Sequence, residues 1–174
     1  LLSKLPQDEQ KILNYQYRFP AQTIVQRNFD VLENILNPMV YEKAAWMLRL
    51  LQQKMGEEQF FNALLTFYEK YKFNNASTED FVAIAKNYSP VPLDDFFQQW
   101  LYVPGTPDLE YKWKYKNGKL ILEFYQKTPY EYQLDIPVMI KYGGQTNEMK
   151  LVSIDSQKQI IEIKCEKPSS VLID

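Results

Sequence analysis

The sequence contains no histidine and only one cysteine among its 174 residues. Imidazole and thiolate groups are the usual ligands of zinc, so we expect this chain to bind no metal by itself. A single cysteine cannot form an internal disulfide, and it therefore does not indicate a redox compartment. Because Cys165 follows Ile161 and Ile163 at a period of two, we expect it to be a small core residue rather than a nucleophile.

Long apolar runs and a strong charge bias are absent as well. No run approaches the roughly 18 residues that a membrane span needs. The net charge of −2 gives no electrostatic reason to expect a nucleic-acid partner. The first ten residues, LLSKLPQDEQ, lack the basic segment and the long apolar core of a signal peptide. They also begin with Leu1 instead of Met, and we expect the chain to be a piece of a longer protein.

The clearest feature that is present is a change of period near the segment Pro104–Pro107 (PGTP). Apolar residues recur at helical spacing before it and alternate with polar residues after it. We therefore predict an α+β chain, with a helical bundle over residues 1–105 and a small antiparallel β-sandwich over residues 106–174. Hydrophobic residues make up 45% of the chain, an ordinary share for a protein with a buried core.

The first part begins with a poorly patterned stretch and then becomes strongly helical. A short helix is predicted over Pro6–Leu13, followed by an extended segment in which Tyr15, Tyr17 and Phe19 alternate. Further along, Asn37 is a good N-cap and Pro38 suits the first turn of a helix. Gly56 is predicted to end that helix with a left-handed cap.

Three more helices are predicted before residue 104. Glu57 and Glu58 open the first of them, and its expected buried residues are Phe60, Phe61, Leu64, Leu65, Tyr68 and Tyr71. Ser77 and Asp80 have the spacing of a capping box, and the apolar face that follows comprises Phe81, Ile84, Ala85 and Tyr88. Pro92 is predicted to start the last helix, with its apolar face formed by Leu93, Phe96, Phe97, Trp100 and Leu101.

The second part has the signals of short antiparallel strands. Asn117-Gly118 predicts a tight hairpin between the strand that carries Tyr111, Trp113 and Tyr115 and the strand that carries Leu120, Leu122 and Phe124. A third strand runs over residues 134–140, where Pro137 indicates an edge position. A turn at Gly143-Gly144 leads to two further strands, over residues 148–154 and 159–165.

Tyr41 is the residue that we expect to take part in chemistry. It lies in the first turn of a predicted helix, where free N–H groups and the positive end of the dipole favour negative charge. A phenol placed there can donate a hydrogen bond to an oxyanion that develops on a substrate. By spacing alone, a tyrosine in a first helical turn is usually a packing or surface residue.

Four motifs connect this region with a known family. They are Tyr41–Ala45 (YEKAA), Gly56–Phe60 (GEEQF), Ala76–Phe81 (ASTEDF) and Trp100–Pro107 (WLYVPGTP). In the same order, these resemble the Y-E-K-G-A, G-x-E-x-F, A-T/S-T-E-D-F and W-L-x-x-P-G-x-P motifs of aminopeptidase N-like metallopeptidases of the gluzincin class. The strand-rich end also resembles the β-sandwich that follows in many members, so the resemblance covers at least residues 37–174.

The resemblance implies a function for the parent protein and a catalytic role for Tyr41. In that family the tyrosine helps a zinc ion to stabilise the tetrahedral intermediate of peptide hydrolysis. The family's H-E-x-x-H motif and its later glutamate ligand do not occur in this chain. The resemblance therefore implies a zinc aminopeptidase fragment that needs the zinc-binding half of its catalytic domain as a partner. It also implies a peptide substrate for the parent and no activity for the chain alone.

One departure from the family pattern leaves a second hypothesis open. Ala44 stands where the family has glycine, and its methyl group could narrow a close approach to a neighbouring helix or a substrate. The alternative is therefore a noncatalytic scaffold or peptide-binding module derived from the same family. Zinc ligands in the intact protein would favour the enzyme, and their absence would favour the module.

Other polar and aromatic groups are weaker candidates. Charged groups near helix starts are usually solvated, which applies to Glu42, Lys43, Glu57, Glu58, Asp94 and Asp95. Alternating lysines could attract an anion but more often mark a solvent-exposed strand face, here Lys112, Lys114 and Lys116. The aromatic stripe on the opposite face of that strand could stack a ligand, although packing is the expected role of Tyr111, Trp113 and Tyr115.

Overall fold

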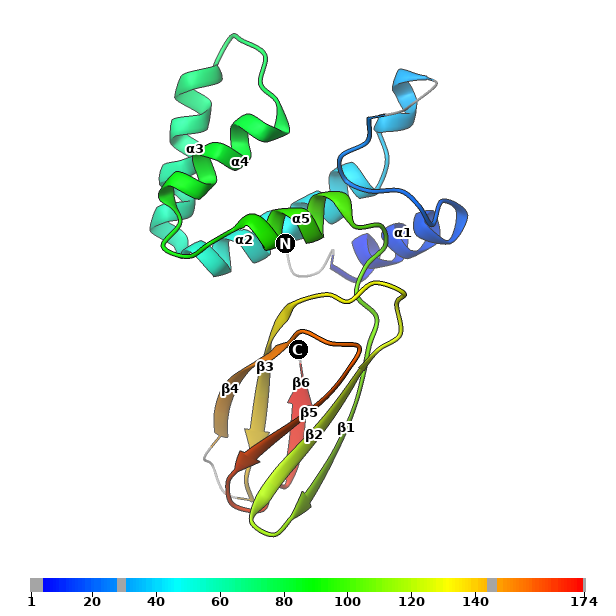
Figure 1. The fold of residues 1–174 in the computed structure, drawn as a ribbon, viewed down its shortest axis with the longest axis vertical. Coiled ribbons are helices and arrows are strands. Elements are labelled where there is room, and N and C mark those ends of the chain that lie inside the picture. The colour runs from blue at the N-terminus through cyan, green and yellow to red at the C-terminus, as the bar shows by residue number, and fades with distance from the viewer. Residues whose placement is uncertain (1–4, 28–30, 144–146, 174) are drawn as a thin grey trace. The chain divides into compact units, whose positions relative to one another are not determined.

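The computed structural model describes residues 5–27, 31–143 and 147–173, and the chain divides into two compact units (Figure 1). The first unit, Leu1–Gly105, contains the helices, and the second, Thr106–Asp174, contains the strands. This arrangement confirms the predicted α+β fold class, with helices first and an antiparallel sandwich after them.

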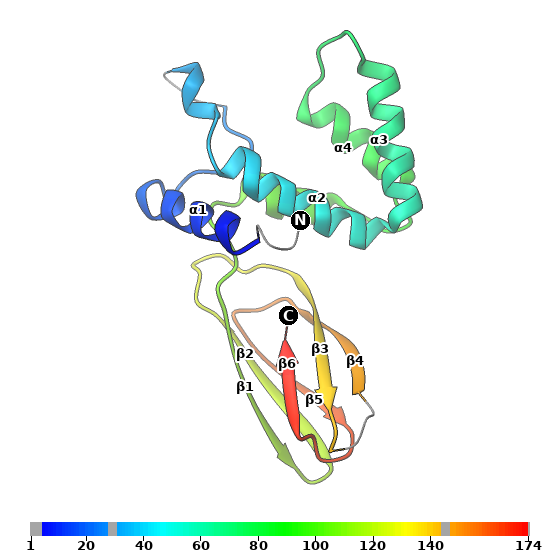
Figure 2. The same ribbon diagram turned by 180° about the vertical axis from the view of Figure 1, so that it is seen from behind.

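The helical unit contains α-helices and two shorter helical segments. Within the described residues its α-helices are α1 (Leu5–Arg18), α2 (Ala44–Met55), α3 (Glu57–Tyr71), α4 (Thr78–Tyr88) and α5 (Asp94–Tyr102). A 3-10 helix, η2 (Leu32–Ile35), and a π-helical turn, η3 (Met39–Lys43), precede α2. α3 and α4 pack against each other (Figures 1 and 2), with the rings of Phe67 and Phe81 5.5 Å apart.

The first helix is longer than predicted. The expected helix ended at Leu13, with Tyr15 and Tyr17 extended, but α1 continues to Arg18 and includes both tyrosines. The rings of Tyr15 and Phe19, four residues apart, lie 4.8 Å from each other, and the Phe19 N–H donates to the Tyr15 carbonyl at 2.9 Å. Aromatic pairs at this spacing stabilise a helix, and the alternation of aromatics concealed the helical period.

The connection between α2 and α3 depends on the glycine that the sequence indicated. Gly56 has φ 84° and ψ 152°, a combination that is essentially restricted to glycine. The positive φ was predicted, but the ψ value differs from that of a left-handed cap. The extended ψ lets the Gly56 carbonyl accept from the Phe60 N–H at 3.0 Å, so one residue ends α2 and starts α3.

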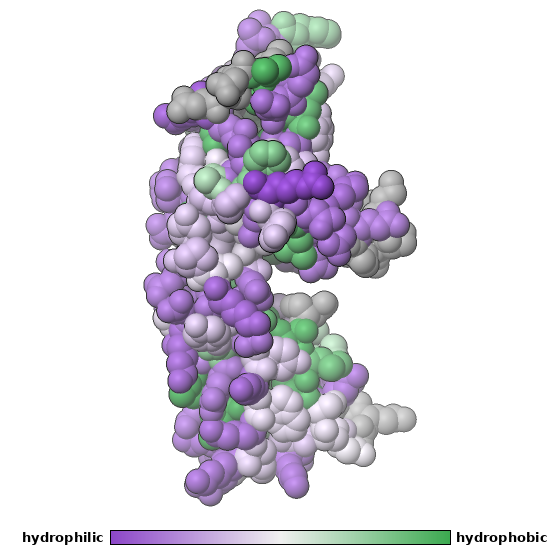
Figure 3. Space-filling view, turned by 90° about the vertical axis from the view of Figure 1, so that its right-hand side faces the viewer, coloured by the Kyte–Doolittle hydropathy of each residue, from purple (hydrophilic) through white to green (hydrophobic). Residues whose placement is uncertain are grey.

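The buried face of α3 is narrower than predicted. Phe60 is buried, whereas Phe61, Leu65 and Tyr68 are 52%, 60% and 61% exposed. The prediction that these three are buried is wrong, because the apolar residues of α3 extend around more of the helix than its neighbours α2 and α4 cover. Figure 3 shows hydrophobic residues at the surface of both units.

The helices after α3 follow the predicted signals closely. The Ser77 hydroxyl accepts from the Asp80 N–H at 3.2 Å and the Asp80 carboxylate accepts from the Ser77 N–H at 2.9 Å, which confirms the capping box of α4. α5 starts at Asp94, two residues after the predicted Pro92. Its predicted inward residues Phe97, Trp100 and Leu101 are buried.

The second unit is a sandwich of two three-stranded antiparallel sheets. Its strands within the described residues are β1 (Leu109–Lys116), β2 (Lys119–Gln126), β3 (Leu134–Lys141), β4 (Asn147–Ile154), β5 (Lys158–Lys164) and β6 (Ser170–Ile173). One sheet has the order β1-β2-β5 and the other has the order β4-β3-β6. The short β6 was not predicted, since four residues are too few to give a periodic signal.

The predicted hairpin is confirmed and the predicted edge strand is not. Asn117 and Gly118 have φ values of 53° and 74°, as a two-residue turn between antiparallel strands requires. Pro137 indicated an edge, but β3 lies in the centre of its sheet. The described pairing of β3 with β6 begins at Val138, so the proline is tolerated beyond the end of a short neighbouring strand. The predicted turn at Gly143-Gly144 includes Gly144, which lies outside the described residues.

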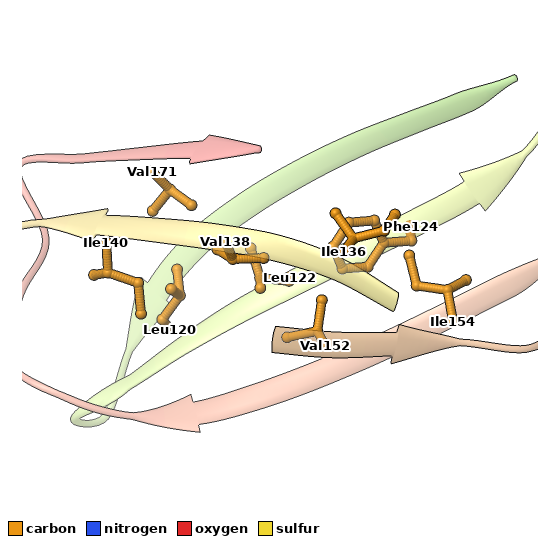
Figure 4. Packing of buried hydrophobic residues seen from close by; sticks show 9 residues of the cluster. All are labelled: Leu120, Leu122, Phe124, Ile136, Val138, Ile140, Val152, Ile154 and Val171. Carbon is orange, nitrogen blue, oxygen red and sulfur yellow. The ribbon is translucent and has the colours of Figure 1, made fainter. Parts of the chain in front are cut away.

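The interior of the sandwich is filled by aliphatic side chains and one aromatic ring from both sheets (Figure 4). The buried residues of this cluster are Leu120, Leu122, Phe124, Ile136, Val138, Ile140, Val152, Ile154 and Val171. Cys165 is partly buried and packs against the cluster, as expected for a small core residue.

A candidate active-site turn

Tyr41 lies on a turn that begins at a buried asparagine. The Asn37 side-chain oxygen accepts from the N–H groups of Met39 at 2.9 Å and Val40 at 3.4 Å. Its side-chain amide donates to the Asn34 carbonyl at 2.8 Å. Asn37 therefore caps the turn, as predicted, and also ties it to η2.

The turn itself is a π-helix instead of the expected first turn of an α-helix. The Lys43 N–H donates to the Pro38 carbonyl at 3.0 Å, and the Ala44 N–H donates to the carbonyls of Met39 and Tyr41. Bonds that span five residues widen the helix, and single π-helical turns of this kind occur frequently at functional sites. The capping signal at Asn37 located the turn, but periodicity could not distinguish a π-turn from an α-turn.

The side chain of Tyr41 projects from this turn. It is 59% exposed, and within the described part of the chain its hydroxyl has no hydrogen bond. Its backbone N–H donates to the Asn37 carbonyl at 3.2 Å, so the main chain is fixed while the phenol is accessible. This geometry leaves the hydroxyl able to donate to a group that approaches from outside.

Glu42 connects the turn to α1. The Lys11 ammonium lies 2.8 Å from the Glu42 carboxylate and 3.5 Å from Asp8. The hydrogen bond and the charge of Glu42 raise the pKa of Lys11. Glu42 was expected to be solvated, but its side chain is only 18% exposed, because α1 partly covers it.

Lys43 is the residue whose environment differs most from the prediction. It was expected to be a solvated charge near a helix start, but it is only 1% exposed. Its ammonium group donates to the carbonyl of Val103, immediately after α5, at 3.2 Å. Burial lowers the pKa of Lys43 to about 8. No sequence signal indicated this contact, since a lysine that follows Glu42 near a helix start has the pattern of an exposed residue.

Ala44 lies beside an apolar cavity of about 610 Å³ in the helical unit. Val40 and Met47 line the same cavity, together with Leu64 and Phe67 of α3. The methyl group that replaces the family's glycine hydrogen is therefore part of the cavity wall.

The other charged candidates belong to other elements of the chain. Glu57 and Glu58 are exposed at the start of α3, and Asp94 pairs with Lys86. Lys114 of the lysine face pairs with Glu123 at 2.6 Å.

The aromatic stripe of β1 has a packing role. The Tyr115 hydroxyl donates to the Cys165 carbonyl at 3.1 Å, and the ring of Tyr111 lies 6.4 Å from that of Phe124. Trp113 is 38% exposed because β1 is the edge strand of its sheet.

The described residues offer no group of three or more histidine, cysteine or acidic side chains that could hold a metal ion. In the same part of the chain, no helix is long and apolar enough to cross a membrane. Tyr41 and its two neighbours thus form the candidate site that this chain contributes.

Comparison with known proteins relates the helical unit to one peptidase family. A model of the peptidase family M1 domain matches residues 7–100. Aminopeptidase M1-C of Oryza sativa subsp. japonica is 34% identical over 83 residues, which are 48% of this chain and 10% of the rice protein. Aminopeptidase N of Escherichia coli (strain K12) is 30% identical over 100 residues, which are 56% of this chain and 11% of that protein. The chain thus spans about a tenth of the length of these relatives.

Similarity of fold covers more of the chain than the family match does. The crystal structure of Legionella pneumophila aminopeptidase A in complex with aspartic acid matches with a TM-score of 0.69 at 19% sequence identity. The match covers 83% of this chain and 17% of the Legionella chain, so it includes part of the sandwich as well as helices.

Proposed function

This chain belongs to peptidase family M1, and we propose that it is the part of a zinc-dependent aminopeptidase that supplies the active-site tyrosine. The family match over residues 7–100 confirms the resemblance that the four motifs predicted. The observation that carries the proposal is the exposed hydroxyl of Tyr41, held on a capped π-helical turn within the matched region.

The zinc ion of such an enzyme does not fit the residues of this chain. The sequence has no histidine and one cysteine, and the described residues contain no cluster of acidic groups that could replace them. We therefore assign the zinc ligands to a part of the protein outside this chain. The chain alone would then have no aminopeptidase activity, and the zinc-binding half would be its partner.

The role of Tyr41 in peptide hydrolysis follows from its hydroxyl. Attack on a peptide carbonyl converts the carbonyl oxygen to an oxyanion, and a positioned phenol can donate a hydrogen bond to it. Because that bond is stronger to the oxyanion than to the substrate carbonyl, it lowers the barrier and does not merely bind substrate. Such a donor typically contributes about 3–4 kcal/mol to the transition state, which corresponds to roughly 10²–10³ in kcat.

The experiment is Tyr41→Phe in the intact protein, with hydrolysis of an aminoacyl anilide as the assay. We expect kcat to fall by about 10²–10³, with KM and bound zinc nearly unchanged. Tyr68→Phe is the matched control, because Tyr68 is also a tyrosine on the surface of the helical unit, 61% exposed. An unaltered kcat in a fully zinc-loaded Tyr41→Phe protein would contradict the catalytic role.

A noncatalytic scaffold or peptide-binding module is the second candidate function. Its supporting observation is Ala44, whose methyl group lines the cavity beside the turn. Zinc analysis of the intact protein separates the two candidates: a protein purified without zinc and without hydrolytic activity would favour the module.

A further inference from the structure

A fully buried lysine within the candidate site is energetically unfavourable and calls for an explanation. Lysine is almost never fully buried unless its charge is paired. Lys43 is 1% exposed, and within the described residues the one hydrogen bond of its side chain is to a neutral carbonyl. A methionine would fill a similar volume without removing a charge from water. Packing alone therefore does not account for a lysine at this position.

The acceptor of Lys43 lies at the end of a helix that is distant in sequence. Val103 directly follows α5 and is 60 residues from Lys43. Carbonyls at this end of a helix lack intrahelical partners, and the dipole there favours a positive charge. Because the acceptor belongs to the backbone, any side chain at position 103 could supply it. The contact thus joins the YEKAA segment to the WLYVPGTP segment.

The geometry of the turn links the buried lysine to the exposed tyrosine. Residues two apart in a helix point to roughly opposite sides, since each residue turns by about 100°. With Lys43 drawn inward to Val103, Tyr41 is directed outward, as its 59% exposure shows. The Ala44 N–H, next to Lys43, donates to the Tyr41 carbonyl and closes the same turn.

We propose that Lys43 is a positioning residue for Tyr41, and that its bond to the Val103 carbonyl fixes the turn from which the tyrosine projects. Its consequence for catalysis rests on the proposed function. The other anchor of the turn, the Lys11–Glu42 pair, is more exposed, and exposed ion pairs contribute little. Lys43 is therefore a stronger anchor of the turn than the Lys11–Glu42 pair.

The first test measures the turn itself in the 174-residue chain. Lys43→Met keeps the apolar stem but removes the donor, and we expect the Ala44 amide to exchange with solvent at least about tenfold faster. The Phe97 amide, which donates to the Leu93 carbonyl at 2.9 Å in α5, reports whether the helical unit is folded. Lys70→Met on the surface of α3 is the matched control. Unchanged exchange at Ala44 in folded Lys43→Met overturns the proposal.

A second measurement applies if Lys43→Met does not fold. The ammonium protons of Lys43 in the unaltered chain can be followed by NMR, and slow exchange supports a buried, bonded ammonium. Exchange as fast as that of Lys70 overturns the proposal.

The third test distinguishes the positioning role of Lys43 from the proposed catalytic role of Tyr41. In the intact protein, misplacing a catalytic group by about 1 Å can reduce the rate by 10²-fold, so we expect Lys43→Met to lower kcat by about 10- to 100-fold. KM and zinc content should be unchanged, and Lys43→Arg, which retains a charged donor, should recover part of kcat. Equal kcat in Lys43→Met and the unaltered protein overturns the positioning role. If Tyr41→Phe has no effect while Ala44 exchange rises in Lys43→Met, the anchor is supported and the proposed function fails.

Discussion

The two units of this chain differ in the residues that they bury. The sandwich closes a continuous aliphatic core, in which Leu120, Leu122 and Val138 are fully buried. The helical unit buries a lysine, leaves an apolar cavity of about 610 Å³ and exposes large residues along α3. Apolar residues also lie at the surface of the sandwich (Figure 3). Met149 and Leu151 on its β4-β3-β6 sheet are 65% and 70% exposed.

This difference indicates that different requirements determine which residues each unit buries. A closed core stabilises a fold, and every side chain in it contributes through area removed from water. The helical unit instead holds Tyr41 in an exposed position, and it uses a costly buried charge near that residue. We therefore expect substitutions in the sandwich to act mainly on stability, and substitutions at the Tyr41 turn to act mainly on activity.

Truncation of leucines gives the largest expected difference between the units. Leu122→Ala removes a fully buried side chain from the sandwich and should cost about 2–5 kcal/mol of unfolding free energy. Leu48→Ala, at a half-buried position that already faces the cavity, should cost less than about 2 kcal/mol. Denaturant titration followed by residue-resolved amide exchange measures both. Equal losses would show that the cavity of the helical unit is closed in solution.

Alkaline pH should affect the two units in opposite directions. The pKa of Lys43 is lowered from 10.5 to about 8 by burial, so above pH 8 the unfolded chain binds more protons at this site than the folded chain. The stability of the helical unit should therefore rise by about 2 kcal/mol between pH 7.5 and pH 10. Below pH 8 both states are protonated and this contribution is constant.

Tyr132 gives the sandwich the opposite response. Burial raises the pKa of Tyr132, so its contribution to stability is present below pH 10 and is lost above it. Near Lys43, the hydrogen bond and charge of Glu42 raise the pKa of Lys11 above 10.5, outside the window from pH 7.5 to pH 10. The measurements are amide exchange in the helical unit across that window and the unfolding free energy of the sandwich above pH 10, and Lys43→Met should abolish the rise in the helical unit. A rise that persists in Lys43→Met would assign it to another group.

The features that could be predicted from the sequence are those that depend on neighbouring residues. Turn and cap residues act locally, and Asn37, Gly56, Ser77 and the Asn117-Gly118 pair were each located correctly as helix or strand boundaries. Alternation in the second part was sufficient for five of the six described strands. These signals depend on neighbours within a few residues, which the sequence contains directly.

Features that depend on distant contacts could not be predicted. The exposure of Phe61 and Leu65 is determined by the number of helices that pack on α3, and the burial of Lys43 by Val103, 60 residues away. The central position of β3 results from the late strand β6, which gave no periodic signal. The identity of Tyr41 as the candidate came from the motif set, and the π-helical turn beneath it came only from the structure.

The smallest expected effect is a loss of unfolding free energy at the capping box of α4. Ser77→Ala removes the hydroxyl that accepts from the Asp80 N–H at 3.2 Å, and the loss of such a cap typically costs about 1 kcal/mol. Asn75→Ala, at an exposed position in the same loop, is the matched control. We expect faster amide exchange in the first turn of α4 and no change at Ala44, because the cap acts on one helix end while the Lys43 anchor acts between segments. If Ser77→Ala also accelerated exchange at Ala44, the helical unit would behave as a single cooperative core, like the sandwich, and the contrast between the two units would not hold.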